Sequence, residues 1–289
     1  RAVLVTVEIT MSVILLITSG LLLRAVWRVQ AVDPGFVTEN VLTIRTALPR
    51  PKYEDPLRRG QFYDRVLNDV RVLPGVRSAA YVSGLPMEMM GGVGAVQVPG
   101  QPIRRGSDGI VSRRFVTSQY FMTLGIPILA GRDIEDGDTA ERAWVAVVSQ
   151  SFVDRYWPGQ DPLGKTFLYA DRLRTVVGVV RDVKVRGRER TTEPQMYLSA
   201  RQVVGAMFSA YDPKELLIRH EGQGMALLPA VRQVVRAVDP EQPVSHIRHL
   251  DDLVAGETAP RRAQLQVLAT LAIIALLLAG IGIHGLLAY

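Results

Sequence analysis

The residues with the clearest chemical spacing are Gly159–Thr166, which read GQDPLGKT. They fit G-x-x-x-x-G-K-[ST], a loop whose amides and lysine hold nucleotide phosphates. That chemistry needs a buried strand before the loop and a helix after it. Here the preceding SFVDRYWP has a helical pattern, the following FLYADRLRTVVGVV has a strand pattern, and Pro162 removes a loop amide. We therefore interpret the motif residues as a structural turn and a false phosphate-loop match: Gly159, Gly164, Lys165 and Thr166.

A second glycine pattern, GIGIHG at residues 280–285, fits the dinucleotide fingerprint G-x-G-x-x-G. The fingerprint must follow a strand and precede an acidic residue about 20 positions on. This match instead lies within an apolar helical run at the end of the chain. We interpret it as small residues that allow close packing between helices.

Isolated ionisable residues predict no reaction centre. Glu8 and His284 lie within apolar runs, where an ionisable group indicates ion coupling or a polar partner. The roles of both stay open. His246 and His249 are three residues apart near a strand end, so they do not share a strand face, and no third ligand is near them. No catalytic, cofactor-binding or metal residues are predicted, and we do not expect an enzyme.

A basic run over residues 181–190, RDVKVRGRER, predicts a solvated hairpin with Gly187 in its turn. Because no aromatic residues are interleaved for base stacking, nucleic acid is not an expected partner. The net charge of +6 permits anionic partners but is no evidence for fold. The chain has no cysteine, which excludes disulfides and thiolate metal sites.

The apolar residues gather at the two ends of the 289-residue chain. Residues 2–23 contain one charged residue, and residues 267–289 contain none apart from a protonatable histidine. Roughly 20 apolar residues are enough to cross a bilayer as a helix. We expect transmembrane helices at 1–23 and 263–289 in a piece of a longer protein, with further membrane segments after Tyr289. Because long domains translocate largely regardless of charge, charge does not decide on which side residues 24–262 lie.

The residues between these runs predict an α+β domain. Strand and helix patterns form two β-α-β units, at 40–83 and 215–247, which commonly pack as a ferredoxin-like layer. The first strand, 40–48, alternates as a half-buried strand does. Residues 110–200 are mostly strand and predict an inserted lobe.

Several segments occur in an order typical of one group of membrane proteins. They are VDPGF (32–36), LPGVRSAAYVSGLP (73–86), YFMTLGIPILAGRDI (120–134), VAVVSQSFVDRYWPGQDPLGKTF (145–167), VVGVVRDV (176–183), PQMYL (194–198), VRAVDPEQPV (235–244) and LAGIGIHGLLAY (278–289). Together they resemble the permease subunits of MacB-like and FtsX-like ABC transporters, and their sequences resemble most the duplicated permeases of the acidobacterial type.

The resemblance implies an extracytoplasmic domain between two membrane helices in a bacterial inner membrane. Its expected parts are a transmembrane helix (1–23), a porter-like lobe in two pieces (24–109 and 201–262), an inserted strand-rich lobe (110–200) and a second transmembrane helix (263–289). It also implies a cytoplasmic ABC ATPase as partner, a homodimer or pseudo-dimer of permease halves, and a periplasmic adaptor. ATP hydrolysis by the partner would drive motion of the outer domain for efflux or envelope export.

Two alternatives belong to other classes. One is a membrane-anchored extracytoplasmic sensor or scaffold that regulates a partner, such as a cell-wall hydrolase, without transport. The other is a membrane-associated nucleotide hydrolase that uses Lys165 and Thr166. The sequence does not name the transported substrate.

Overall fold

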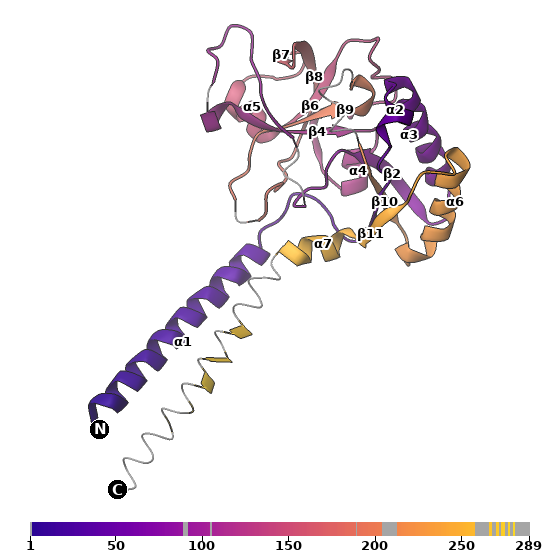
Figure 1. Ribbon diagram of the computed structural model, residues 1–289. Coiled ribbons are helices and arrows are strands. Elements are labelled where there is room, and N and C mark those ends of the chain that lie inside the picture. Colours follow the sequence, from indigo (N-terminus) through magenta and orange to yellow (C-terminus); the bar gives the residue numbers. More distant parts are fainter. Residues whose placement is uncertain are drawn as a thin grey trace. The chain divides into compact units, whose positions relative to one another are not determined.

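A computed structural model describes residues 2–88, 92–104, 106–188, 190–203 and 213–257, with isolated residues between 266 and 280. The chain divides into two compact units. One is Pro34–Val254, and the other combines Arg1–Asp33 with Ala255–Tyr289. The unit Pro34–Val254 contains all the strands described below (Figure 1).

Helix α1 (Ala2–Gln30) covers the first apolar run. Among the described residues, no helix combines the length and the apolar content needed to cross a membrane. The side chain of Glu8 lies outside the described part of the structure, as do most of the second apolar run, the GIGIHG residues 281–285 and His284.

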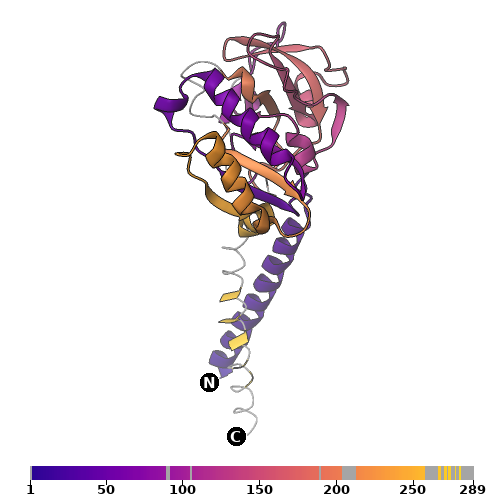
Figure 2. The same ribbon diagram turned by 90° about the vertical axis from the view of Figure 1, so that its right-hand side faces the viewer.

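Four strands and two helices form a split β-α-β arrangement. The strands lie in the order β11-β1-β10-β2, in which neighbours are antiparallel. This is the ferredoxin-like order, and it agrees with the two predicted β-α-β units. Helices α3 and α6 pack side by side on one face of these strands (Figure 2). We call this the split part; its elements are β1 (Val41–Arg45), α3 (Pro56–Arg71), β2 (Val76–Val82), β10 (Glu215–His220), α6 (Leu228–Val238) and β11 (Ser245–His249).

Strand β1 is buried on both faces, so the expectation of a half-buried strand was wrong. Leu42 and Ile44 pack under α3 and α6, whereas Val41 packs on the opposite side with α4 (Tyr120–Leu124). Thr43 is also buried and donates its hydroxyl hydrogen to the carbonyl oxygen of Arg248. The alternation of polar and apolar residues misleads here because a buried hydroxyl group with a partner costs little.

Six of the remaining strands form a closed ring of pairings. The sheet continues from β4 through β9, β6 and β8 to β7, and β3 pairs with β4. Gln97, just after β3, exchanges two backbone hydrogen bonds with Leu168 of β7, and this closes the circuit. We call these six strands the strand ring: β3 (Gly92–Ala95), β4 (Ile110–Val116), β6 (Val145–Ser149), β7 (Thr166–Tyr169), β8 (Arg172–Val180) and β9 (Gln195–Ser199).

The inside of the strand ring is an apolar core of its own. Phe115, Phe167 and Met196 point into it, and helix α5 (Gln150–Tyr156) adds Phe152. The turn between β7 and β8 lies at Ala170-Asp171, and both residues have positive φ. Small closed sheets of this size are filled by their own side chains.

The split part and the strand ring share one sheet but little pairing. Among the described residues, β2 and β4 are paired only at Val82 and Val116. Side chains make the rest of the connection. Tyr120 and Phe121 of α4 pack against Tyr197 of β9 in a core that also contains residues of β1, β2 and β10. This shared core therefore sets how firmly the two parts hold together.

A few elements differ from the sequence prediction. Strand β5 (Ile128–Gly131), which pairs with β8, and the short helix α2 (Arg50–Tyr53) were not predicted. Helix α7 (Leu250–Glu257) follows β11.

The sequence predicts a solvated hairpin for the basic run 181–190, and this prediction is wrong. Val183, Val185 and Gly187 are buried, and no strand lies on either side of the turn at Gly187 among the described residues. Arg186 pairs with Glu193 at 2.8 Å. The charge pattern misleads because every second residue of this extended segment packs inward.

Candidate functional site

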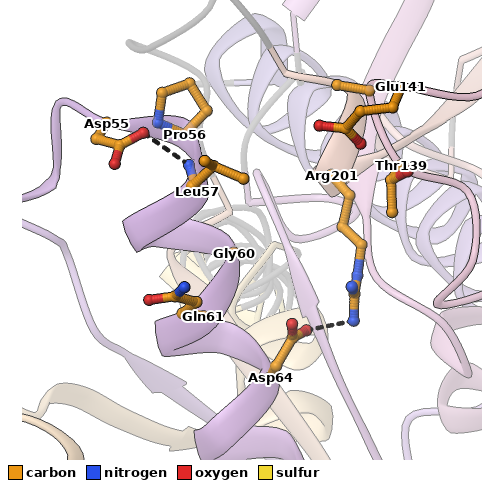
Figure 3. A pocket seen from close by; sticks show the side chains of 10 residues that line it. Asp55, Pro56, Leu57, Gly60, Gln61, Asp64, Thr139, Glu141 and Arg201 are labelled. Carbon is orange, nitrogen blue, oxygen red and sulfur yellow. Dashed lines mark hydrogen bonds and ion pairs between the residues drawn. The ribbon is translucent and has the colours of Figure 1, made fainter.

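A pocket of about 390 Å³ lies between helix α3 and the segment around residues 139–141. That volume is within the range of small-molecule sites. Figure 3 shows its walls, with α3 on one side and Thr139, Glu141 and Arg201 on the other. The lining residues are Asp55, Pro56, Leu57, Gly60, Gln61, Asp64, Thr139, Ala140, Glu141 and Arg201.

The α3 wall is positioned by the start of the helix. Asp55 is the N-cap and accepts a hydrogen bond from the backbone amide of Leu57 at 3.0 Å. Pro56 follows at the first helical position, where its fixed φ suits a helix start. Leu57 is 67 % exposed, which leaves an apolar side chain at the mouth of the pocket. Asp64 lies further along the same helix and also lines the pocket.

Arg201 joins the two walls. It lies in the short helix η2 (Ala200–Gln202) and pairs with Asp64 at 2.5 Å (Figure 3). It also lies 3.6 Å from a carboxylate oxygen of Asp136. Burial raises the pKa of the Asp64 carboxyl group, and the Arg201 charge opposes that rise. No motif marks this pair, because its members are 137 positions apart and neither has a distinctive neighbour.

The lining is suited to reversible binding. It combines three carboxylates, one guanidinium group already paired with a carboxylate, and apolar atoms of Pro56, Leu57 and Ala140. Among the described residues, no group of three or more His, Asp or Glu side chains is arranged to hold a metal ion.

The predicted false phosphate loop lies away from this pocket, between α5 and β7. The backbone amides of Gly164 and Lys165 donate to the carbonyl oxygens of Val176 and Pro162, and the Leu163 amide donates to Asp161. The Lys165 ammonium group donates to Gln160 and lies 5.9 Å from the Trp157 ring centroid. A helix precedes this loop and a strand follows it, which is the reverse of the order that a phosphate loop requires.

His246 and His249, for which the sequence predicts no metal role, lie in different surroundings. His246 is exposed and has a φ of 49°. His249 instead packs against His220, a residue not singled out by the sequence, with ring centroids 5.9 Å apart. His220 is 3 % exposed, and neither of its ring nitrogens has a hydrogen-bond partner among the described residues.

Burial lowers the pKa of His220, and the neighbouring His249 and Arg219 lower it further, although nearby backbone groups at Glu221 and Gly222 oppose this. The unfolded chain therefore binds a proton more readily than the folded chain. Stability from this residue is fully present above the ordinary histidine pKa and is lost as the pH falls below it.

We expect the urea midpoint to fall between pH 7.5 and pH 5.5, and to fall by less in His220→Asn. The control His246→Asn replaces an exposed residue of positive φ by asparagine, which tolerates that conformation, and should keep the wild-type fall. An unchanged fall of the urea midpoint in His220→Asn would contradict the assignment.

The sequence of the chain matches a known protein family over most of the chain's length. The profile described as MacB-like periplasmic core domain matches residues 4–248. The chain belongs to this family. It is therefore a MacB-like periplasmic core domain of the ABC transporter permease type, with the mixed α/β sheet described above.

Individual relatives agree with this assignment. The chain is 30 % identical over 124 residues to the macrolide export ATP-binding/permease proteins MacB of Neisseria gonorrhoeae and Neisseria meningitidis. The match covers 43 % of the chain and only 18 % of those relatives. The crystal structure of the periplasmic region of MacB from Actinobacillus actinomycetemcomitans has a TM-score of 0.51 at 16 % identity, and covers 75 % of this chain and 92 % of that one. This last likeness shows the fold alone.

Proposed function

We propose that the chain provides the extracytoplasmic domain of a MacB/FtsX-type ABC transporter permease. This domain would move when a cytoplasmic ATPase partner hydrolyses ATP. The observation that carries the proposal is the family match over residues 4–248. The two-part construction supports it, since the described residues join the split part to the strand ring through the β2–β4 pairing and a side-chain core. Such a joint can transmit motion between two rigid bodies.

The same proposal assigns parts and partners. The apolar runs 1–23 and 263–289 would anchor the chain in a bacterial inner membrane, with residues 24–262 on the periplasmic side. Residues 24–109 and 201–262 would form the porter-like lobe, apart from β3 (Gly92–Ala95), which pairs with β4, and residues 110–200 would form the inserted lobe. The permease would act as a homodimer or pseudo-dimer with an ATPase and a periplasmic adaptor. Because the Neisseria relatives are named for macrolide export, a macrolide is the first compound to test.

The proposal gives no catalytic, cofactor or metal role to the chain. Gly159, Gly164, Lys165 and Thr166 would form a structural turn, and ATP hydrolysis would belong to the partner. The hydrogen bonds that the loop amides already make within the protein support this assignment.

The test uses the full-length protein in membranes. Because the chain has no cysteine, Asn68→Cys on the exposed side of α3 reports its location to a membrane-impermeant maleimide. We expect labelling in intact cells, no labelling of the buried control Val70→Cys, co-purification of an ABC ATPase, and a several-fold change in that ATPase's rate on association. Labelling only after lysis would overturn the location. Labelling in intact cells without an associated ATPase would favour the sensor or scaffold.

A further inference from the structure

The strand ring contains two arginines on its apolar inner face. Arg113 lies on β4 between Val111 and Phe115, and both neighbours belong to the core of the ring. Arg174 lies on β8 two positions before Val176, which also belongs to that core. Since side chains alternate along a strand, both guanidinium groups share a side of the sheet with apolar residues. Arg113 is 5 % exposed and Arg174 is 1 % exposed.

Aromatic rings bring these two side chains together. The guanidinium carbons of Arg113 and Arg174 lie 5.5 and 5.9 Å from the centroid of the Tyr169 ring. Arg174 also lies 4.6 Å from the Trp144 ring centroid, and Arg172 lies 5.1 Å from the same ring. Glycines make room for the arrangement, because a Cβ at Gly92 would overlap the Arg113 guanidinium group.

Arg174 lacks the partners that a buried arginine requires. Its Nε and Nη1 atoms are buried and have no hydrogen-bond partner among the described residues. The charged groups that act on it are cations, Arg113 and Arg172. Burial, followed by these two charges, lowers the pKa of Arg174 to about 9. The Trp144 ring stabilises the face of the guanidinium group but offers no acceptor to the N–H groups at its edge.

We propose that Arg174, together with Arg113, binds an oxyanion of the phosphate type at the Trp144–Tyr169 side of the strand ring. A guanidinium group presents N–H donors in a planar fork that matches two oxygens of a phosphate. A bound oxyanion would supply the acceptors that Nε and Nη1 lack and would offset the repulsion among three cations. Inorganic phosphate and the phosphate of an anionic lipid headgroup share this chemistry.

The test is the thermal stability of the full chain in detergent at constant ionic strength, as chloride is replaced by inorganic phosphate. At a phosphate concentration about 100 times its dissociation constant, we expect the melting temperature to rise by roughly 5–10 °C. Arg174→Met should remove this rise and, in chloride alone, melt at or above the wild-type temperature, because it removes a buried unpaired charge. Arg174→Lys keeps the positive charge but lacks the planar N–H donors of a guanidinium group, so phosphate should raise its melting temperature by less than in the wild type. This variant keeps the test informative if Arg174→Met does not fold. The matched control, Arg65→Met on the exposed side of α3, removes one positive charge elsewhere and should keep the full rise.

A second arm identifies the source of the oxyanion. Wild-type protein is mixed with phosphatidylglycerol vesicles or with phosphatidylcholine vesicles, without inorganic phosphate. Stabilisation by inorganic phosphate assigns a soluble oxyanion, and stabilisation by phosphatidylglycerol alone assigns a lipid headgroup. If neither stabilises the wild-type protein, or if Arg174→Met responds as the wild type does, the proposal is overturned.

Discussion

Gly35→Ala is expected to lower the free energy of unfolding by about 3 kcal/mol or more. Gly35 has a φ of +82°, and a Cβ there would overlap the backbone carbonyl oxygen of Asp182. The two segments are held together by the Lys184 amide, which donates to the Pro34 carbonyl oxygen at 2.8 Å. Because both overlapping groups are attached to backbone, an alanine forces the segments apart. Urea unfolding of the full chain measures the loss.

Gly100→Ala is the matched control. Gly100 has a similar φ of +78°, but a Cβ there would meet no atom within 4 Å. This variant should lose only about 1 kcal/mol, the cost of a left-handed conformation for a residue with a side chain. Equal losses in the two variants would show that φ alone matters and that the close approach to Asp182 does not.

Phe121→Ala is expected to cost about 3–5 kcal/mol, a large share of the stability of an ordinary domain. The ring is fully buried between the split part and the strand ring. It makes edge contacts with Tyr120 and Tyr197, with centroids 5.3 and 4.9 Å away. The cavity left by the substitution lies where β2 and β4, in the part of the chain that the structure describes, are paired only at Val82 and Val116.

Met122→Ala provides the control one position along the same helix. Met122 is 55 % exposed, so its truncation should change stability by no more than about 0.5 kcal/mol. Limited proteolysis adds a second readout, since loosening of the shared core in Phe121→Ala should make the connections between the two parts more accessible. A loss below about 1 kcal/mol in Phe121→Ala would contradict a structural role for this core.

Local patterns were enough to predict most elements of the fold. The two β-α-β units follow from the periodicity of their strand and helix patterns, and the first of them contains α3. The closure of the strand ring did not follow, because it depends on backbone bonds between Gln97 and Leu168, whose side chains give no sign of pairing. The burial of Val183 and Val185 was hidden by the charges around them.

The candidate pocket could not be predicted for a related reason. Asp64 and Arg201 are ordinary surface-type residues in the sequence, and only the fold brings them within 2.5 Å. Arg174 is a stronger case, since an arginine in a strand normally predicts a solvated side. Two of the segments that resemble the family, VDPGF (32–36) and VVGVVRDV (176–183), contain Gly35 and Asp182. The sequence did not predict that the backbones of these two residues approach each other closely.

The position of the strand ring within the chain has a consequence for how the protein folds. Strands β2 and β10 are neighbours in the sheet, yet the whole ring lies between them in sequence. An unstructured connection of that length would make their pairing slow, because the entropy of loop closure must be lost first. Once the ring is folded, its chain ends are held near each other and the connection becomes short. Folding should therefore begin in the inserted segment, and synthesis on the ribosome delivers that segment before β10 and β11 are available.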